Sequence, residues 1–412
     1  MRVAIVNLFY PPDLAASAHF ARSLAEHRAG LGDDVTVICG KGSYLGGRSA
    51  APLDEAGLDP RVKVVRLWTP ALGKATAARR LGDYLAFLAG ATARLAFGPR
   101  QDVVIAMTAP PYVLTAAVVH KILHPGARVI LWSQDVYPDA AEEYGTVRRG
   151  GLASRILRAV QRWLLRRTDH VVALDEAMLA RTLAHVEPEG RPAGSVIPNS
   201  EPVALFPSDA SPPRWEGYEG LDGFVALYLG NLGFGHPTGT IAEAATRLDT
   251  EDVTFLFVGG GVRYPEMAAA ARRRGLSDVV LHGYVPKERT PNVLAGADCA
   301  LISLGDGSLG IMSPCKLHGG LALGIPVAYV GPVGSNVDRA IQEYACGFSV
   351  RQGDVDGLVE AIRRLRDDPA LASEMSRNAR KAFEEAYSDE QTLPQFDRLL
   401  TEVVLPGPDP GE

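Results

Sequence analysis

Short apolar runs recur along the whole chain, and longer segments of mixed apolar and polar residues separate them. The runs show little alternation, which is typical of parallel strands that are buried on both faces. The first-half runs span residues 3–8, 35–39, 62–68, 102–107, 128–132 and 170–174. The second-half runs span 224–230, 253–259, 279–285, 298–303, 325–331 and 347–350. This pattern predicts an α/β protein with two doubly wound, Rossmann-like parallel sheets.

A stretch without periodicity separates the two series of runs. Residues 198–220 are rich in Pro, Ser and Gly, which is typical of a linker. We therefore expect an N-terminal Rossmann-like domain, a linker, a C-terminal Rossmann-like domain, a helix that returns to the N-terminal domain, and a disordered tail. The expected bounds are, in that order, 1–200, 201–220, 221–385, 386–405 and 406–412.

Composition narrows the range of partners. The chain has 412 residues, 47% of them hydrophobic, which is enough for two cores. A net charge of −6 argues against general nucleic-acid binding, and we expect no nucleic-acid partner. The four cysteines are scattered without a CxxC spacing, as expected for buried thiols in a reducing compartment. The first residues lead directly into a strand-like run, and no apolar run approaches twenty residues, so we expect a cytoplasmic protein.

A single lysine, Lys316, stands between a loop of small residues and an apolar, helix-like segment. A strand, a Gly/Ser loop and a helix N-terminus together direct backbone N–H groups at an anion. We expect that anion to be a nucleotide diphosphate. The alternative is a solvated lysine that caps the helix.

In open parallel sheets, ligands bind in the loops after the strands. The loop 133–139 follows an apolar run and contains Asp135. A carboxylate here can accept a proton or stabilise a developing positive charge. The alternative is a turn or N-cap aspartate before Pro138. Asp139 and Glu142 are expected to be helix-start carboxylates.

An ordered series of motifs runs through both halves of the chain. The C-terminal half contains "ALYLGNLGFGHPTGTIAEAATRL", "FLFVGGG", "VVLHGYVPKERTPNVLAGADCALISL" and "MSPCKLHGGLALGIPVAYVGP". The N-terminal half contains "NLFYPPD", "LWSQDVYPDAAEEYG" and "SVIPNSEP". The series resembles glycosyltransferase family 4 with the GT-B fold, in the subgroup of colanic-acid-type and other polysaccharide transferases.

The resemblance implies transfer of a hexosyl-type sugar from a nucleotide-diphosphate donor to an acceptor hydroxyl. Transfer in this family usually proceeds with retention and without an obligatory metal, so we expect neither metal nor cofactor. It also implies that the strand ends of the two domains face each other across a cleft. The acceptor stays open between a sugar, a lipid-linked molecule and a small molecule, in polysaccharide, glycolipid or natural-product glycosylation.

The resemblance places the donor in the C-terminal half. Lys316 would offset the charge of the departing diphosphate, as a preorganised cation does in many sites. Tyr284 and Val285 would meet the base through their loop backbone. The other expected donor contacts are Gly230, Asn231, Gly233, Gly310, Ile311, Met312 and Ser313. For Gly233, a plain turn is the alternative.

The sequence departs from the family pattern at three places. Two glutamates eight positions apart are common in the family, and here their positions hold Ile311 and Gly319. A basic pair after the first C-terminal strand is also absent. His236 is the only titratable residue in that loop, and as an imidazolium it could contact phosphate. The alternative is a histidine that packs within the turn.

The acceptor side is assigned to residues that follow N-terminal strands. The expected residues are Ser17, His19, Gln134, Asp135 and Asn199. For His19, a satisfied helix-face histidine is the favoured alternative. Asp354 and Asp356 form a DxD sequence, but an N-cap with an acidic first turn explains it better than a metal site.

Residues 151–167 form a basic amphipathic pattern. The apolar positions are Leu152, Ile156, Val160, Trp163 and Leu164, and the arginine stripe is Arg155, Arg158, Arg162 and Arg166. Such helices can dock on anionic lipid at the inner face of a membrane. In an α/β domain the apolar side is expected to pack on the sheet, which leaves only the arginine stripe for lipid.

Two other functions are compatible with the same pattern. A sugar-nucleotide epimerase of the GT-B class would need several carboxylates and histidines, and the sequence offers few. A non-catalytic partner of a transferase would explain the missing glutamates. A secreted two-lobed binding protein is a further alternative, which the expected lack of a signal peptide disfavours.

Overall fold

The computed structural model divides the chain into two compact units. Unit 1 comprises Met1–Pro198 and the C-terminal segment from Leu393, and unit 2 comprises Asn199–Thr392. The expected disordered tail, 406–412, lies outside the described residues. The structure describes residues 1–13, 15–41, 57–70, 77–207, 212–249, 251–276 and 278–404.

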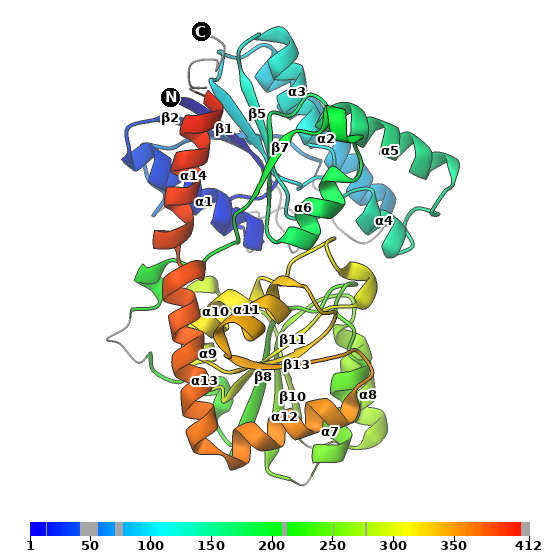
Figure 1. The fold of residues 1–412 in the computed structure, drawn as a ribbon, viewed down its shortest axis with the longest axis vertical. Coiled ribbons are helices and arrows are strands. Elements are labelled where there is room, and N and C mark those ends of the chain that lie inside the picture. Colours follow the sequence, from blue (N-terminus) through cyan, green and yellow to red (C-terminus); the bar gives the residue numbers. More distant parts are fainter. Residues whose placement is uncertain are drawn as a thin grey trace. The chain divides into compact units, whose positions relative to one another are not determined.

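Unit 1 is built on a parallel sheet of seven strands. Its strands are β1 (Arg2–Val6), β2 (Asp34–Gly40), β3 (Lys63–Leu67), β4 (Val103–Ala106), β5 (Arg128–Trp132), β6 (His170–Ala173) and β7 (Ala193–Val196). They lie in the order β3-β2-β1-β4-β5-β6-β7 (Figure 1). Strands β2 and β3 are added on one side of β1 and strands β4 to β7 on the other, so the order of addition reverses between β1 and β4. The apolar runs predicted six of these strands. The sequence missed β7 because this edge strand reads Ala-Gly-Ser-Val and is largely exposed.

Helices cover both faces of the unit 1 sheet (Figure 1). They are α1 (Ala16–Gly30), α2 (Ala77–Ala96), α3 (Leu114–Leu123), α4 (Asp139–Glu143), α5 (Leu152–Leu165), α6 (Glu176–Leu183) and the second part of α14 (Asp389–Val404). α14 packs on unit 1 through Phe396, whose ring centroid lies 4.7 Å from that of Trp132. Asp397 of the same helix accepts a hydrogen bond of 2.7 Å from Arg28.

Unit 2 is built on a parallel sheet of six strands. Its strands are β8 (Phe224–Asn231), β9 (Val253–Gly260), β10 (Val279–His282), β11 (Cys299–Ser303), β12 (Val327–Val330) and β13 (Gly347–Val350). They lie in the order β10-β9-β8-β11-β12-β13. Four of them lie within the predicted apolar runs, and β8 and β9 extend one residue beyond theirs. The predicted α/β fold with two parallel sheets is confirmed.

The strands of unit 2 are buried on both faces, which explains their unbroken apolar runs. Along β8, Val225 and Leu227 join one core cluster, and Ala226 and Tyr228 join the other. The first cluster packs under α9, α10, α11 and α13, and the second under α7, α8 and α12. These helices are α7 (Gly239–Leu248), α8 (Tyr264–Arg274), α9 (Thr290–Leu294), α10 (Lys316–Ala322), α11 (Asn336–Tyr344), α12 (Val355–Asp367) and α13 (Pro369–Ala382).

The Asp-x-Asp sequence caps a helix. The Asp354 side chain accepts a hydrogen bond of 2.9 Å from the Gly357 N–H at the start of α12. Asp356 pairs with Arg247 of α7. The prediction of an N-cap with an acidic first turn is confirmed.

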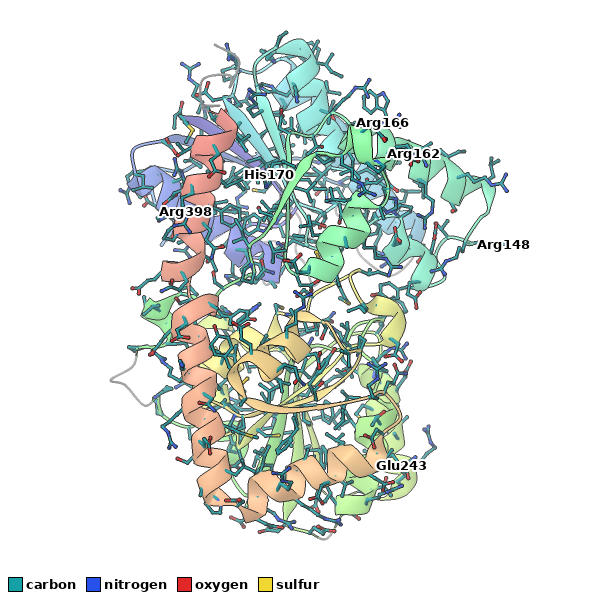
Figure 2. The ribbon with its side chains drawn as sticks, viewed as in Figure 1. Arg148, Arg162, Arg166, His170, Glu243 and Arg398 are labelled. Carbon is teal, nitrogen blue, oxygen red and sulfur yellow. The ribbon has the colours of Figure 1, made fainter. Side chains whose placement is uncertain are left out.

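The apolar side of α5 does not pack on the sheet, and that prediction is wrong. Leu152, Ile156, Val160 and Trp163 are exposed, and Leu164 alone of the five is buried. The buried strip of the helix lies beside this exposed row and comprises Ser154, Gln161, Leu164 and Leu165, of which the two leucines join the core of unit 1. Figure 2 shows Arg148 in the loop before α5 and Arg162 and Arg166 near the C-terminal end of that helix. Within the described residues, no helix has the length and hydropathy needed to cross a bilayer.

Candidate functional site

Lys316 is a half-buried cation. It is the first residue of α10, and its Nζ lies 3.2 Å from His236 Nε2 and 5.1 Å from the centroid of the Tyr228 ring. Among the described residues no carboxylate forms an ion pair with it. Burial lowers the Lys316 pKa to about 8, so the side chain still carries its charge at neutral pH. An ammonium in this setting is suited to bind an anion.

His236 orients that ammonium and is itself uncharged. Its Nδ1 lies 2.5 Å from the Ser303 carbonyl oxygen, which can only accept, so Nδ1 carries the proton and Nε2 can accept from Lys316. Burial, with the adjacent Lys316 charge, lowers the His236 pKa to about 3. The neutral state favours the alternative of a histidine that packs within the turn, and its contact with a phosphate stays a prediction. The buried histidine contacts Lys316.

Two glycines let the strand ends approach this lysine. Gly230, at the end of β8, has φ +119°, and a Cβ there would lie 3.5 Å from Lys316 Cε. Gly259, on the neighbouring strand β9, has φ +144°, and a Cβ there would lie 2.2 Å from the Gly230 carbonyl oxygen. Residues with a side chain rarely adopt these φ values, and the second contact is impossible for them. The sequence analysis identified Gly230 and missed Gly259, although "FVGGG" signals a close backbone approach.

Asn231 and Tyr284 form the outer part of the same cluster. The Tyr284 hydroxyl donates to Asn231 Oδ1 at 3.1 Å, and its ring rests against Gly260, where a Cβ would lie 2.7 Å away. Tyr284 is 39% exposed, and Val285 beside it is half-buried. Gly233 closes the intervening turn, in which the His236 N–H donates to the Gly233 carbonyl at 3.1 Å. This geometry supports the turn alternative for Gly233.

The loop before α10 presents backbone more than side chains. Gly310 has φ +69°, and the Ile311 N–H donates to the Ser308 carbonyl at 2.9 Å. The Ile311 side chain is fully buried, so only its backbone can face a ligand. Met312 and Ser313 are half-buried. The expected contacts of these residues with a donor stay predictions.

The two positions where the family commonly has glutamate are apolar and packed. A Cβ at Gly319 would lie 3.1 Å from Leu294 Cδ1, so the leucine fills the space beside the helix. Ile311 belongs to the interior of unit 2. Neither position leaves an open place for a carboxylate.

Asp135 lies in unit 1, in the loop after β5. The Thr108 hydroxyl oxygen accepts from the backbone N–H groups of Gln134 and Asp135, both at 3.1 Å, and so fixes the loop. Asp135 lines a cavity of about 20 Å³ together with Ser133, Tyr137, Gln161 and Thr182, which is room for about one water molecule. Burial raises the Asp135 pKa to about 6, so the carboxylate is mostly ionised at neutral pH.

Ion pairs hold the segment after Asp135. Asp139 contacts His185 and Arg181, and Glu142 accepts from Arg158 at 2.6 Å. Burial alone would raise the Asp139 pKa, but the hydrogen bond and charge of His185, with the nearby arginines, lower it to about 2. Both carboxylates lie in α4, as predicted, and their role is structural.

The remaining expected acceptor residues are spread over two units. Ser17 accepts a hydrogen bond of 3.3 Å from Asn7, a buried residue directly after β1 that the sequence analysis missed. His19 is half-buried on α1. Asn199 is buried and is the first residue of unit 2, and its expected role on the acceptor side stays a prediction. A polar residue directly after an apolar run is the signal that could have identified Asn7.

Two family models match the chain. The model described as "Glycosyl transferase 4-like domain" matches residues 16–199, and that described as "Glycosyl transferases group 1" matches residues 223–368. The colanic acid biosynthesis glycosyl transferase WcaI of Escherichia coli is 26% identical over 280 residues, which cover 66% of this chain and 67% of that protein.

Solved structures show the same fold. Sucrose-phosphate synthase of Thermosynechococcus elongatus superposes with a TM-score of 0.75 at 16% identity, over 97% of this chain and 98% of that one. HepE of Anabaena, whose structure contains UDP and glucose, superposes with a TM-score of 0.71 at 14% identity, over 97% of this chain and 99% of that one.

Proposed function

Because the chain belongs to glycosyltransferase family 4, with the two parallel-sheet units of the GT-B fold, we propose that it transfers a hexosyl-type sugar from a nucleotide-diphosphate donor to an acceptor hydroxyl. The observation that carries the donor assignment is Lys316, a half-buried ammonium with no carboxylate partner among the described residues. A diphosphate supplies the missing negative charge.

Lys316 stabilises the charge that develops as the bond between sugar and diphosphate breaks. A preorganised cation in a water-poor site contributes most where charge increases between ground state and transition state. The neutral His236 accepts a hydrogen bond from the ammonium through its Nε2. Because the histidine carries no negative charge, it does not neutralise the ammonium and leaves it free to bind an anion. Positioning by a neutral group therefore leaves the full positive charge available to the leaving phosphate.

The other donor contacts follow from the same cluster. The backbone at Gly230 and around Gly310 approaches the diphosphate, and the Tyr284–Val285 loop meets the base. HepE binds UDP and glucose, so UDP-glucose is the first donor to test. We propose that binding needs no metal, since the lysine supplies the charge that a cation would otherwise bring.

Asp135 serves the acceptor. At neutral pH its carboxylate can orient the attacking hydroxyl or receive its proton, and a base with a pKa near 6 suits such a role. We propose transfer with retention, the usual outcome in this family. The acceptor is a sugar, a lipid-linked molecule or a small molecule, and the protein works in the cytoplasm, at the inner face of the membrane when the acceptor is lipid-linked.

The experiment is a thermal-shift screen with UDP, GDP, ADP, TDP and their sugar conjugates in the presence of EDTA. A ligand that binds only the folded state raises the melting temperature. Lys316→Ala should abolish the shift, whereas Lys381→Ala, which changes an exposed lysine of the same unit, should leave it intact. A shift that survives Lys316→Ala would contradict the donor assignment.

The packed environment of Gly319 favours a second candidate, a non-catalytic partner of a transferase. Leu294 occupies the space beside the position where relatives commonly have the glutamate that holds the donor ribose. This candidate predicts either no nucleotide binding or binding without turnover. Release of nucleotide in the presence of a panel of acceptors distinguishes it from the transferase.

A further inference from the structure

Helix α5 of unit 1 carries a row of exposed apolar side chains. Leu152, Ile156, Val160 and Trp163 are 77%, 54%, 38% and 42% exposed. Their spacing of three and four residues places them on one face of the helix. Exposure of such an apolar row to water costs free energy, and contiguous exposed apolar side chains often mark a surface that contacts an apolar partner.

The same segment is strongly basic. Residues 144–168 contain seven arginines and no aspartate or glutamate, although the whole chain has a net charge of −6. Arg158 pairs with Glu142, and Arg149 lies near Glu142 and Glu143. The other five form no ion pair with a carboxylate in the described part of the chain. They are Arg148, Arg155, Arg162, Arg166 and Arg167.

α5 is held firmly enough to present this face. Ser154 donates to Glu142 at 2.7 Å, Arg158 pairs with the same carboxylate, and Leu164 and Leu165 are fully buried. The outward face thus stays exposed while the inward face is fixed by buried contacts. No rearrangement of unit 1 is needed to expose it.

The inward face of α5 also reaches the candidate acceptor site. Gln161 is buried on that face and lines the same cavity as Asp135. One helix therefore connects the exposed apolar row with the carboxylate that we assign to the acceptor. A partner on the outer face would lie one helix diameter from that cavity, about 10 Å.

We propose that this face of α5 docks on a lipid bilayer that contains anionic head groups. The four apolar side chains enter the boundary between head groups and acyl chains, and the arginines bind lipid phosphates. This is the arrangement of an interfacial amphipathic helix. The sequence analysis expected only the arginines to contact lipid, whereas in this proposal the apolar side chains contact it as well.

Charge decides between lipid and a second copy of the chain. A two-fold dimer would bring the same patch of each copy together and place the arginines of one copy against those of the other. An anionic lipid surface meets both the apolar row and the positive charge. The proposal goes beyond the proposed glycosyl transfer and does not depend on it.

The test is co-sedimentation of the full chain with vesicles of phosphatidylcholine alone and of phosphatidylcholine mixed with phosphatidylglycerol. The wild-type chain should bind the mixed vesicles, and the Trp163 emission should shift to the blue, by difference from Trp163→Phe. Ile156→Glu combined with Val160→Glu should weaken binding roughly tenfold or more. Arg155→Gln with Arg166→Gln should weaken it and reduce its dependence on salt.

A matched control is Leu31→Glu, which changes a leucine of unit 1 that is 59% exposed at the end of α1. This variant should bind vesicles as the wild type does. Circular dichroism and melting temperature should be unchanged in all variants, since every altered side chain is exposed.

Three outcomes would overturn the proposal. The first is absence of binding to mixed vesicles. The second is binding that the Ile156/Val160 variant retains and high salt removes completely, which would restrict the contact to arginines. The third is a dimer in solution that this variant dissociates, without vesicle binding, which would assign the face to a second copy. Nucleotide binding in solution is measured separately, so failure here leaves the transferase proposal standing.

Discussion

Lys316 and Asp135 are half-buried groups of opposite charge, and their surroundings hold them in different ways. Lys316 has a direct side-chain partner, since His236 contacts its ammonium at 3.2 Å. Asp135 is fixed through its backbone, which donates to Thr108, and burial is the sole cause of its raised pKa. Burial lowers one pKa to about 8 and raises the other to about 6, so both groups remain charged near pH 7.

The difference between them indicates different tasks. A cation whose position is fixed by a neutral neighbour is suited to stabilise charge at a constant place. A carboxylate with a pKa just below neutrality, which no cation among the described residues pairs with, is suited to exchange a proton. The comparison supports our proposal that unit 2 binds the donor phosphate and unit 1 activates the acceptor, and each part of the proposal can be tested alone.

The largest effect is expected from Lys316→Ala. Loss of a preorganised charge at a developing anion lowers kcat by roughly two to three orders of magnitude. The melting temperature should fall little, because the fold no longer has to bury an ammonium. Turnover with UDP-glucose and a melting curve check both. A large loss of stability with unchanged donor affinity would make the lysine structural.

A smaller but still large effect is expected from Asp135→Asn. Removal of a general base lowers the rate by about two orders of magnitude. The asparagine keeps the volume and removes a buried charge, so at pH 7 the free energy of unfolding should rise, by on the order of 1 kcal/mol after allowance for partial exposure.

The pH dependence of stability in Asp135→Asn separates the two roles. The folded-state pKa of about 6 lies above the ordinary value of 3.8. The aspartic acid thus stabilises the fold below pH 3.8, and this contribution is lost as the pH rises through 6. The gain from asparagine should therefore be present at pH 7 and absent at pH 3.5. A variant that is less stable at pH 7 would indicate a structural carboxylate.

The pH profile of kcat/KM should be bell-shaped. It should rise through about pH 6, where Asp135 loses its proton, and fall through about pH 8, where Lys316 loses its own. Each limb should approach a tenfold change per pH unit. In Lys316→Ala the alkaline fall should disappear while the acidic limb remains, and a retained alkaline limb would assign that ionisation elsewhere.

The sequence predicted the two sheets well because strands buried on both faces leave continuous apolar runs, as at β8 and β9. It failed at β7, whose edge position requires no apolar run. It also placed the apolar side of α5 inside the fold. Periodicity identifies an apolar face and does not say whether the fold covers it.

The sequence allowed the residues of the candidate site to be selected, but it did not reveal the protonation state of His236. Lys316, Asp135 and Gly230 could be selected because they follow strands, where ligands bind in open parallel sheets. The state of His236 depends on two atoms far away in sequence, the Ser303 oxygen and Lys316 Nζ, and no local pattern encodes them. The sequence analysis missed Thr108 for the same reason, because Thr108 and Asp135 are 27 residues apart in the sequence.

The smallest effect, and the one that most directly tests the comparison, is expected from His236→Asn. Asparagine can still offer an acceptor but is shorter, so the ammonium loses its fixed position rather than its charge. We expect kcat to fall roughly tenfold, which corresponds to about 1.4 kcal/mol. The lowering of the Lys316 pKa arises mainly from burial, so the alkaline limb should stay near pH 8. If the loss instead matched that of Lys316→Ala, His236 would contact the donor itself, and the division between a charged group and its neutral support would be wrong.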